Sequence, residues 1–148
     1  MKIKDCMSKN VCCVKPETKI TEIVKLMKDN HIGCVPVCDN SNSVCGILTD
    51  RDILLRTVAC NKDINTATAS EIMSTNVCTC KQDDDISNAE NKMSTYQIRR
   101  LPVVENNKIV GMLTLGDLAH YEEELGKENV CTTISNICNC NGENKNAC

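Results

Sequence analysis

Two Thr–Asp pairs are the residues of this sequence whose types and spacing suggest chemistry. Thr49 and Asp52 lie in the stretch GILTDRD, and Thr114 and Asp117 lie in GMLTLGD. A helix that starts at such a Thr offers free N–H groups to a phosphate, the Thr hydroxyl adds a donor, and the Asp carboxylate can accept both hydroxyls of a ribose. Sugar and phosphate together indicate a nucleotide.

The same spacing has a purely structural interpretation. In a capping box, the Thr side chain accepts a hydrogen bond from the first helical turn, and the acid three residues later accepts one from the backbone N–H of the Thr. Both interpretations use one geometry, so the local sequence leaves both open. If the pairs serve only as caps, replacing Asp by Asn costs modest stability in each copy and changes no binding.

The two motifs belong to a longer internal duplication. An offset of 66 residues pairs Met7–Ser8 with Met73–Ser74, and Pro36–Val37 with Pro102–Val103. The offset then becomes 65, because the first copy has one more residue between its strands, and the two Thr–Asp motifs align. Duplicated folding units tolerate such a slip at a loop.

Each copy predicts the elements that position its motif. Helices with apolar residues at helical spacing are predicted after Thr18 and after Asp84 as N-caps, and second helices begin near Asp50 and Leu115. Six short apolar runs are predicted as strands: VCCV (11–14), CVPVC (34–38) and VCGIL (44–48), then VCTC (77–80), RLPVV (100–104) and IVGML (109–113). The order is β-α-β-β-α in each copy.

A unit of this size buries only about 60% of the surface that its open chain exposes, so one copy alone is marginal. We therefore expect an α/β fold in which two repeats, residues 1–66 and 67–125, pack sheet to sheet about an approximate two-fold axis. Clefts between the copies would be a natural place for ligands. Residues 126–148 are polar and rich in Asn and Cys, and we expect a flexible tail there.

Composition excludes several classes of protein. The 148 residues carry a formal charge of −3, so we expect no general binding to nucleic acid. The first residues lack the apolar core of a secretion signal, and no apolar run approaches the roughly 18 residues of a membrane span. We expect a cytoplasmic protein that does not bind membranes.

Cysteine is frequent and aromatic residues are scarce. There are 13 cysteines, an odd count with no export signal, and the aromatic residues are Tyr96 and Tyr121. We expect most of these thiols to be reduced and to pack in a core of Ile, Val, Leu, Met and Cys.

The duplicated pattern, with Met-Ser before the first strand, an apolar-Pro-Val strand and the Thr–Asp motif entering the last helix, resembles the CBS (cystathionine β-synthase) domain pair, also called a Bateman module. The likeness spans about residues 1–125. It implies a free-standing regulatory protein that binds AMP, ADP, ATP or S-adenosylmethionine, requires no cofactor, forms homodimers by packing helices face to face, and signals to a protein partner that the sequence does not identify.

The resemblance also implies that each binding site draws residues from both copies. One site would contain Thr49, Asp52, Ser74, Cys78, Ile98 and Arg99, and the other Thr114, Asp117, Arg100, Ser8, Cys12, Ile32 and Gly33. Arg51 would add charge at the first site. Because the second copy has two arginines where the first has Gly33 and Cys34, we expect unequal affinities. The alternative role of these two arginines is a solvated strand end.

Other functions have weaker support. No nucleophile elbow, Walker loop or HExxH motif is present, and neither His31 nor His120 has a catalytic partner at a telling spacing, so we expect neither an enzyme nor a metal site. One alternative is a thiol-based metal or redox function through Cys131, Cys138, Cys140 and Cys148, although their spacing is a poor match to a zinc ribbon. Another is a structural dimer whose clefts stay unused.

Overall fold

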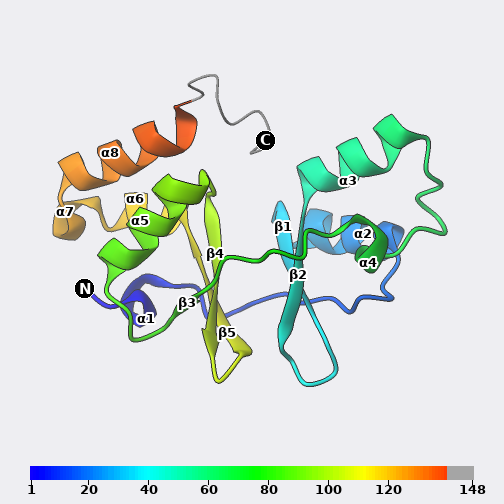
Figure 1. The fold of residues 1–148 in the computed structure, drawn as a ribbon, viewed down its shortest axis with the longest axis horizontal. Helices are drawn as coiled ribbons and strands as arrows, with labels where there is room; N and C mark the ends of the chain where they lie inside the picture. The colour runs from blue at the N-terminus through cyan, green and yellow to red at the C-terminus, as the bar shows by residue number, and fades with distance from the viewer. Residues whose placement is uncertain (140–148) are drawn as a thin grey trace. The chain divides into compact units, whose positions relative to one another are not determined.

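The computed structural model of this protein describes residues 1–139, and Figure 1 shows their helices and strands. The chain separates into two compact units. Unit 1 contains residues 1–10, residues 78–105 and the described residues from 110 onward, and unit 2 contains residues 11–77 and 106–109. Each unit has its own cluster of buried apolar side chains, so each has its own hydrophobic core.

The compact units interleave the two sequence repeats. Residues 1–10 precede the first repeat's strands but belong to unit 1, which holds the strands of the second repeat, and the segment before the second repeat's first strand belongs to unit 2. Sequence repeats and compact units are therefore different divisions of the chain. The repeat limits at residues 66 and 125 stay a prediction.

Unit 2 is built on an antiparallel hairpin, in which Val35 lies opposite Leu48. Its elements are α2 (Ile20–Asn30), β1 (Cys34–Cys38), β2 (Val44–Thr49), α3 (Asp50–Arg56), the 3-10 helix η1 (Val58–Cys60) and α4 (Ala69–Ile72). All five residues of β1 are buried, as an uninterrupted apolar run predicts. The strands pack with Ile20 and Ile23 of α2 in one core.

Unit 1 is built on a three-stranded sheet in the order β3-β4-β5, with β3 and β4 parallel. Its elements are α1 (Ile3–Cys6), β3 (Cys80–Lys81), α5 (Ile86–Tyr96), β4 (Arg100–Glu105), β5 (Lys108–Thr114), α6 (Leu115–His120), α7 (Glu122–Leu125) and α8 (Lys127–Cys138). The first two residues of β5 are counted with unit 2. Asn106 and Asn107 connect β4 to β5 with φ of 48° and 66°. Such a two-residue turn needs positive φ at both positions, which Asn tolerates.

The hairpins and the second helix of each copy are confirmed, whereas the first strands are shorter than predicted. In the first copy the run 11–14 contributes only an isolated bridge between Val14 and Val37. In the second, only Cys80 of the run 77–80 lies in a strand, which Lys81 completes. An apolar run alone does not ensure a regular ladder, because a strand also needs a partner along its whole length.

The N-caps of the first helices lie one residue later than predicted. Lys19 precedes α2 and Asp85 precedes α5. Thr18 instead accepts a hydrogen bond from the backbone N–H of Lys15 at 3.0 Å, and its counterpart Asp84 accepts one from Lys81 at 3.1 Å. Both predicted caps therefore stabilise the turn before the helix.

The expected flexible tail differs from the structure over most of its described length. Residues 127–138 form α8, which lies along α5 in Figure 1. Val130, Thr133 and Ile137 are buried, and the Thr133 hydroxyl donates to the Asn129 carbonyl, so its polar atom has a partner. Buried positions three and four residues apart form a stripe that polar composition conceals. Residues 140–148 lie outside the described residues.

Candidate functional site

The first Thr–Asp pair forms a reciprocal capping box at the start of α3. Thr49 has extended backbone angles, and its side-chain oxygen accepts a hydrogen bond from the N–H of Asp52 at 3.1 Å. Oδ2 of Asp52 accepts one from the N–H of Thr49 at 3.0 Å. The exchange satisfies two backbone donors at the helix start.

The second pair repeats this geometry at the start of α6. The N–H of Asp117 donates to the Thr114 hydroxyl at 3.2 Å, and Oδ2 of Asp117 accepts from the N–H of Thr114 at 2.7 Å. The Thr114 hydroxyl also donates to the same Oδ2 at 2.7 Å. The structural interpretation of the motif is therefore confirmed in both copies.

Capping does not use up either carboxylate. An ionised carboxylate has about four acceptor positions on two oxygens, and the cap uses Oδ2 in both copies. Oδ1 of Asp117 accepts no hydrogen bond from residues 1–139. A ribose hydroxyl could bind there without breaking the cap, so the two interpretations of the motif are compatible, and the ligand interpretation stays a prediction.

Arg56, the last residue of α3, joins the first motif to a distant segment. Its Nη2 lies 3.5 Å from Oδ1 of Asp52. Its Nη1 donates to the carbonyl of Ile72 at 2.7 Å and to the hydroxyl of Ser74 at 3.2 Å. Arg56 is not among the site residues expected from the sequence. Its position four residues after Asp52, which suits an ion pair on a helix, was the signal that could have identified it.

The motif glycines allow the Met-Ser segments to approach. A Cβ added at Gly46 would lie 2.3 Å from the sulfur of Met73, and one added at Gly111 would lie 2.5 Å from the sulfur of Met7. Atoms do not approach so closely, so a side chain at either position would force the methionine to move. The two parts of the sequence motif are thus neighbours in the fold.

The serines of the Met-Ser segments pair with the strands that lead into the motifs. Ser74 exchanges two backbone hydrogen bonds of 3.0 Å with Ile47 in unit 2. Ser8 exchanges two of 2.9 Å with Met112 in unit 1. Each lies near the Thr–Asp motif with which the sequence analysis grouped it.

Backbone contacts place the residues before the Pro-Val strands beside the motifs. The carbonyl of Gly33 accepts from the N–H of Asp50 at 3.0 Å, and that of Arg99 accepts from Leu115 at 2.9 Å. The side chain of Arg51 is exposed and makes no hydrogen bond or ion pair with residues 1–139.

The remaining expected site residues are at most partly exposed. Ile32 packs against the core of unit 2, whereas Cys78 and Ile98 pack against the core of unit 1. Cys12 is half-buried, and Arg100 begins β4. Because each expected site takes residues from both units, the grouping into two composite sites stays a prediction.

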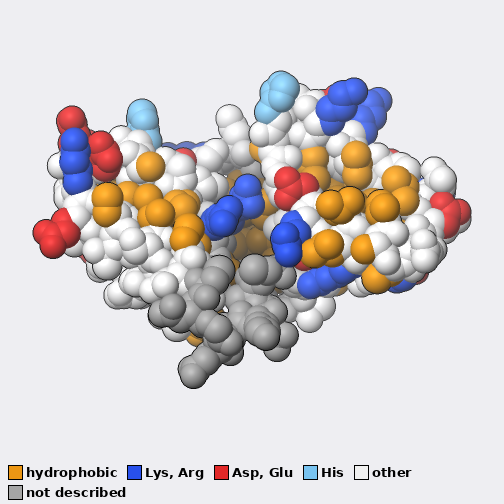
Figure 2. Space-filling model, turned by 90° about the horizontal axis from the view of Figure 1, so that it is seen from above, with side chains coloured by type: hydrophobic (Ala, Val, Ile, Leu, Met, Phe, Trp, Pro, Cys, Tyr) orange, Lys and Arg blue, Asp and Glu red, His pale blue; other side chains and the backbone are white. Residues whose placement is uncertain are grey.

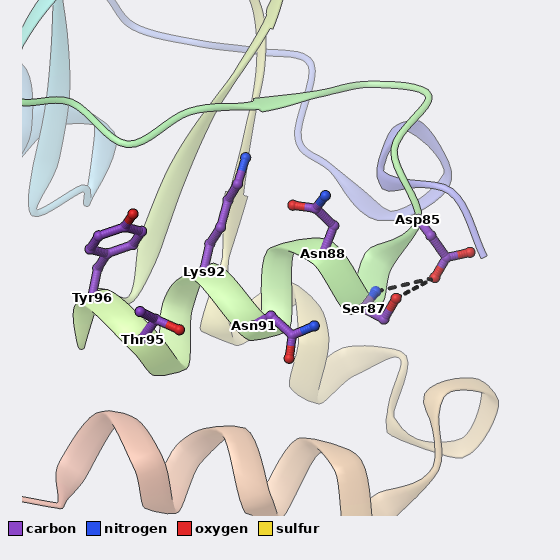
Figure 3. Close-up of a pocket in the computed structure, with 7 residues that line it drawn as sticks. All are labelled: Asp85, Ser87, Asn88, Asn91, Lys92, Thr95 and Tyr96. Carbon is purple, nitrogen blue, oxygen red and sulfur yellow. Dashed lines mark hydrogen bonds between the residues drawn. The ribbon is translucent and has the colours of Figure 1, made fainter.

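A cavity of about 520 Å³ lies along α5, and no residue of either Thr–Asp motif lines it (Figure 3). Its lining is polar and contains no residue expected at a binding site: Asp85, Ser87, Asn88, Asn91, Lys92, Thr95 and Tyr96. The Lys92 ammonium donates to the Thr79 carbonyl at 2.7 Å, and the Asp85 carboxylate caps α5, so both charged groups already have partners.

Most cysteines in the two cores are protonated at neutral pH. Burial, with a smaller contribution from the nearby Cys13, raises the pKa of the Cys38 thiol to about 12. Burial also raises the pKa of Cys80 to about 12 and that of Cys6 to about 11. Thiolates are the reactive and metal-binding form, so these three residues behave as packing groups.

The part of the chain that the structure describes has neither a metal-binding cluster nor a membrane-spanning helix. No group of three or more His, Cys, Asp or Glu side chains in this part could hold a metal ion. No helix in it combines the length and the apolar character needed to cross a membrane. Cys140 and Cys148 of the alternative tail site lie outside the described residues.

Curated proteins of similar sequence cover nearly the whole chain. CBS domain-containing protein YhcV of Bacillus subtilis is 38% identical over 139 residues, which are 94% of this chain and 96% of that protein. Hypoxic response protein 1 of Mycobacterium tuberculosis is 33% identical over 121 residues, which are 82% of this chain and 85% of that protein.

Solved structures of similar fold include a crystal structure of Hypoxic Response Protein I with two coordinated zinc ions, at 32% identity and a TM-score of 0.74 over 82% of this chain and 98% of that one. Another is a CBS domain pair in complex with 5′-methylthioadenosine and S-adenosyl-L-methionine, at 30% identity and a TM-score of 0.76 over 84% and 98%.

The sequence profile of the CBS domain matches residues 3–58 and 69–124, which include both Thr–Asp motifs. The mixed helix and strand fold matches that of solved CBS domain pairs. The chain therefore belongs to the CBS domain family and carries two CBS domains in tandem.

Proposed function

We propose that this chain is a free-standing regulatory module that binds an adenosine compound, with Asp52 and Asp117 as acceptors for the ribose hydroxyls. The observation that carries the proposal is the orientation of the two carboxylates. Each is held by its cap through Oδ2 alone, so the other oxygen is positioned without being consumed. A preorganised acceptor binds with little loss of side-chain entropy.

The related structure with 5′-methylthioadenosine and S-adenosyl-L-methionine supports an adenosine compound as the ligand. The resemblance of the sequence to CBS domain pairs implies AMP, ADP and ATP as further candidate ligands. Without Trp or Phe in the chain, the adenine would lie between aliphatic side chains and backbone amides.

Regulation follows from linkage. A ligand that contacts both CBS domains favours one arrangement of them, and it shifts the equilibrium only by its difference in affinity for the two states. A protein partner in the cytoplasm would respond to that shift. The proposal assigns binding and signalling to this chain and no catalysis.

A homodimer is part of the proposal. Val24 of α2, Leu54 and Leu55 of α3 and Val58 of η1 are 40%, 57%, 41% and 58% exposed, and these elements contact one another. Figure 2 shows apolar side chains gathered on the surface with charged ones at their margins. Exposed apolar groups of this kind mark association surfaces, and a second copy would cover them.

The alternative is a structural dimer that binds no ligand. The completed capping boxes favour it, because they give both aspartates a structural role. The two possibilities differ in the response to ligand.

A thermal-shift panel of AMP, ADP, ATP and S-adenosylmethionine separates them. At about 100 times the dissociation constant a ligand adds about 2.7 kcal/mol to the free energy of unfolding. We expect at least one compound to do so, and Asp52→Asn and Asp117→Asn to abolish one site each, because Asn still caps a helix but carries no charge. A flat response in folded protein would favour the structural dimer.

The matched control is Glu71→Gln. Glu71 and Thr68 form a third capping box, at the start of α4, in which the carboxylate accepts from the Thr68 N–H at 3.0 Å. This box lies outside the repeated motif. We expect Glu71→Gln to cost similar stability and to leave ligand binding unchanged.

A further inference from the structure

The two motif aspartates have different electrostatic surroundings. Asp52 lies 3.5 Å from the Arg56 guanidinium. With the offset of 65, the residue that matches Arg56 beside Asp117 is Tyr121, which is uncharged and packs against the core of unit 1. The first carboxylate and its partner have a net charge of zero, whereas the second carboxylate keeps a charge of −1.

The Arg56 guanidinium offsets the charge of Asp52 but leaves its Oδ1 able to accept a hydrogen bond. The separation of 3.5 Å exceeds the usual 2.7–3.2 Å of a hydrogen bond. Oδ1 of Asp52 therefore keeps its capacity to accept a ribose hydroxyl while the positive charge lies beside it. Asp117 presents the same acceptor and takes part in no ion pair within residues 1–139.

Arg56 also keeps donors for a ligand. A guanidinium has five N–H groups. Nη1 donates to the Ile72 carbonyl and the Ser74 hydroxyl, and one Nη2 N–H faces Asp52. The Nε–H and the second Nη2 N–H make no hydrogen bond within residues 1–139, and the side chain is 47% exposed. These donors form the planar fork that suits phosphate oxygens.

Hydrogen bonds to the end of α4 and to Ser74 hold the Arg56 guanidinium in place. Ile72 is the last residue of α4, so Arg56 caps a carbonyl at the end of that helix. Ser74 is itself fixed by its pairing with Ile47. The cation is therefore held beside the first motif by groups that belong to the same unit.

We propose that Arg56 makes the Asp52 site select adenosine compounds with a 5′ phosphate. The inference rests on the proposed function and identifies the ligand class of one of its two sites. At the first site, the 5′ phosphate of the ligand would lie near the Asp52–Arg56 ion pair, whose net charge is zero. The guanidinium of this pair still has N–H groups that can donate to the phosphate.

The test compares AMP with adenosine by calorimetric titration in Asp117→Asn protein, which isolates the first site. We expect AMP to bind more tightly. Arg56→Gln should weaken AMP binding about tenfold, which is about 1.4 kcal/mol, and leave adenosine within about twofold. Arg56→Lys keeps the charge and loses the fork, so its effect should be smaller.

The control for the loss of one positive charge is Lys25→Gln. Lys25 is exposed on α2 of the same unit and takes part in no ion pair of residues 1–139. It should leave the ratio of AMP to adenosine affinity unchanged. If Arg56→Gln weakens both ligands equally, or if AMP binds no better than adenosine before the substitution, Arg56 is only structural and the inference is overturned.

Salt provides a second measurement that needs no substitution at Arg56. Raising the salt from about 0.05 M to about 0.5 M shortens the screening length severalfold, so the preference for AMP at the first site should fall. A preference that does not change with salt would also overturn the inference. If no adenosine compound binds at all, the proposed function itself is refuted. Failure of the proposed function and failure of the inference about Arg56 are therefore distinguishable.

Discussion

Asp52 and Asp117 each stabilise a helix start through Oδ2. The same hydrogen bonds orient the second oxygen, which is the acceptor that we propose for a ribose hydroxyl. A capping interaction is worth about 1 kcal/mol, so the orientation comes with a gain in stability.

The carboxyl of Glu90 in α5 is partly buried, which disfavours its charged form. Its Oε1 is buried and has no hydrogen-bond partner among the described residues, and burial raises the pKa of the carboxyl, with a further increase from Asp85. Because the folded pKa lies above the unfolded one, the folded state holds its proton longer. This carboxyl therefore lowers stability progressively as pH rises through that interval.

We expect Glu90→Gln to raise the melting temperature more at pH 7 than near pH 4, because a carboxyl whose folded pKa is raised lowers stability only as pH rises above its unfolded pKa. Thermal unfolding between these pH values measures the difference. Glu17→Gln, at an exposed position, is the control and should show no such pH dependence. Equal effects of Glu90→Gln at both pH values would exclude the ionic explanation.

We expect the rate at which each cysteine reacts with an alkylating reagent to follow its exposure. Cys60, Cys131 and Cys138 are exposed, whereas burial raises the pKa of Cys38 and Cys80 to about 12. Alkylation of the folded protein at pH 7.5, read by mass spectrometry, should modify these exposed thiols before Cys38 and Cys80. Rapid reaction of Cys38 or Cys80 would contradict this order and would favour a thiol-based metal or redox function.

At the scale of elements, α8 shows how a polar segment joins a core. Three buried side chains spaced along one face are enough to hold it against unit 1. Gln97, the residue after α5, adds hydrogen bonds from its side-chain amide to the carbonyls of Asn136 and Asn139, at 3.4 and 3.0 Å. The helix is thereby fixed at both its middle and its end.

Ile137→Ala should lower the free energy of unfolding by about 2 kcal/mol, because Ile137 is only 6% exposed and its side chain belongs to the core of unit 1. Urea unfolding measures the change. The control is Cys131→Ala, which lies on the exposed side of the same helix and should cost less than about 0.5 kcal/mol. Equal costs would mean that α8 is not docked in solution.

At the scale of the whole molecule, the duplicated surfaces have diverged. Leu54, Leu55 and Val58 of the first repeat match Ala119, His120 and Glu123 of the second by the offset of 65. The apolar set is exposed in the first repeat, and the second replaces it with small or polar residues. A second copy should therefore dock on the α2 and α3 side.

Leu54→Gln combined with Val58→Gln should weaken the dimer at least tenfold, because burying one such side chain contributes about 1.5–3 kcal/mol. Sedimentation equilibrium over a range of concentrations gives the constant. Tyr96→Gln removes an equally exposed apolar group from unit 1, 59% accessible, and should have no effect. A chain that is monomeric throughout, or equal effects of both changes, would contradict this interface.

Much of the fold was predictable because it depends on local patterns. The hairpin runs at 34–38 and 44–48 are apolar and flank a turn of polar residues, and they form β1 and β2. The predicted caps at Thr18 and Asp84 differ by one residue because such side chains can cap a turn as readily as a helix. No local signal separates these two uses.

By itself, the sequence determined the duplication, the hairpins and the helix starts at Thr49 and Thr114, since all three follow from periodicity and from hydrogen bonds between residues close in the chain. Only the tertiary structure decided that Arg56 reaches Ser74, and that α8 covers α5. These contacts join segments separated by long stretches of chain, and their pairing depends on how each hydrophobic core closes.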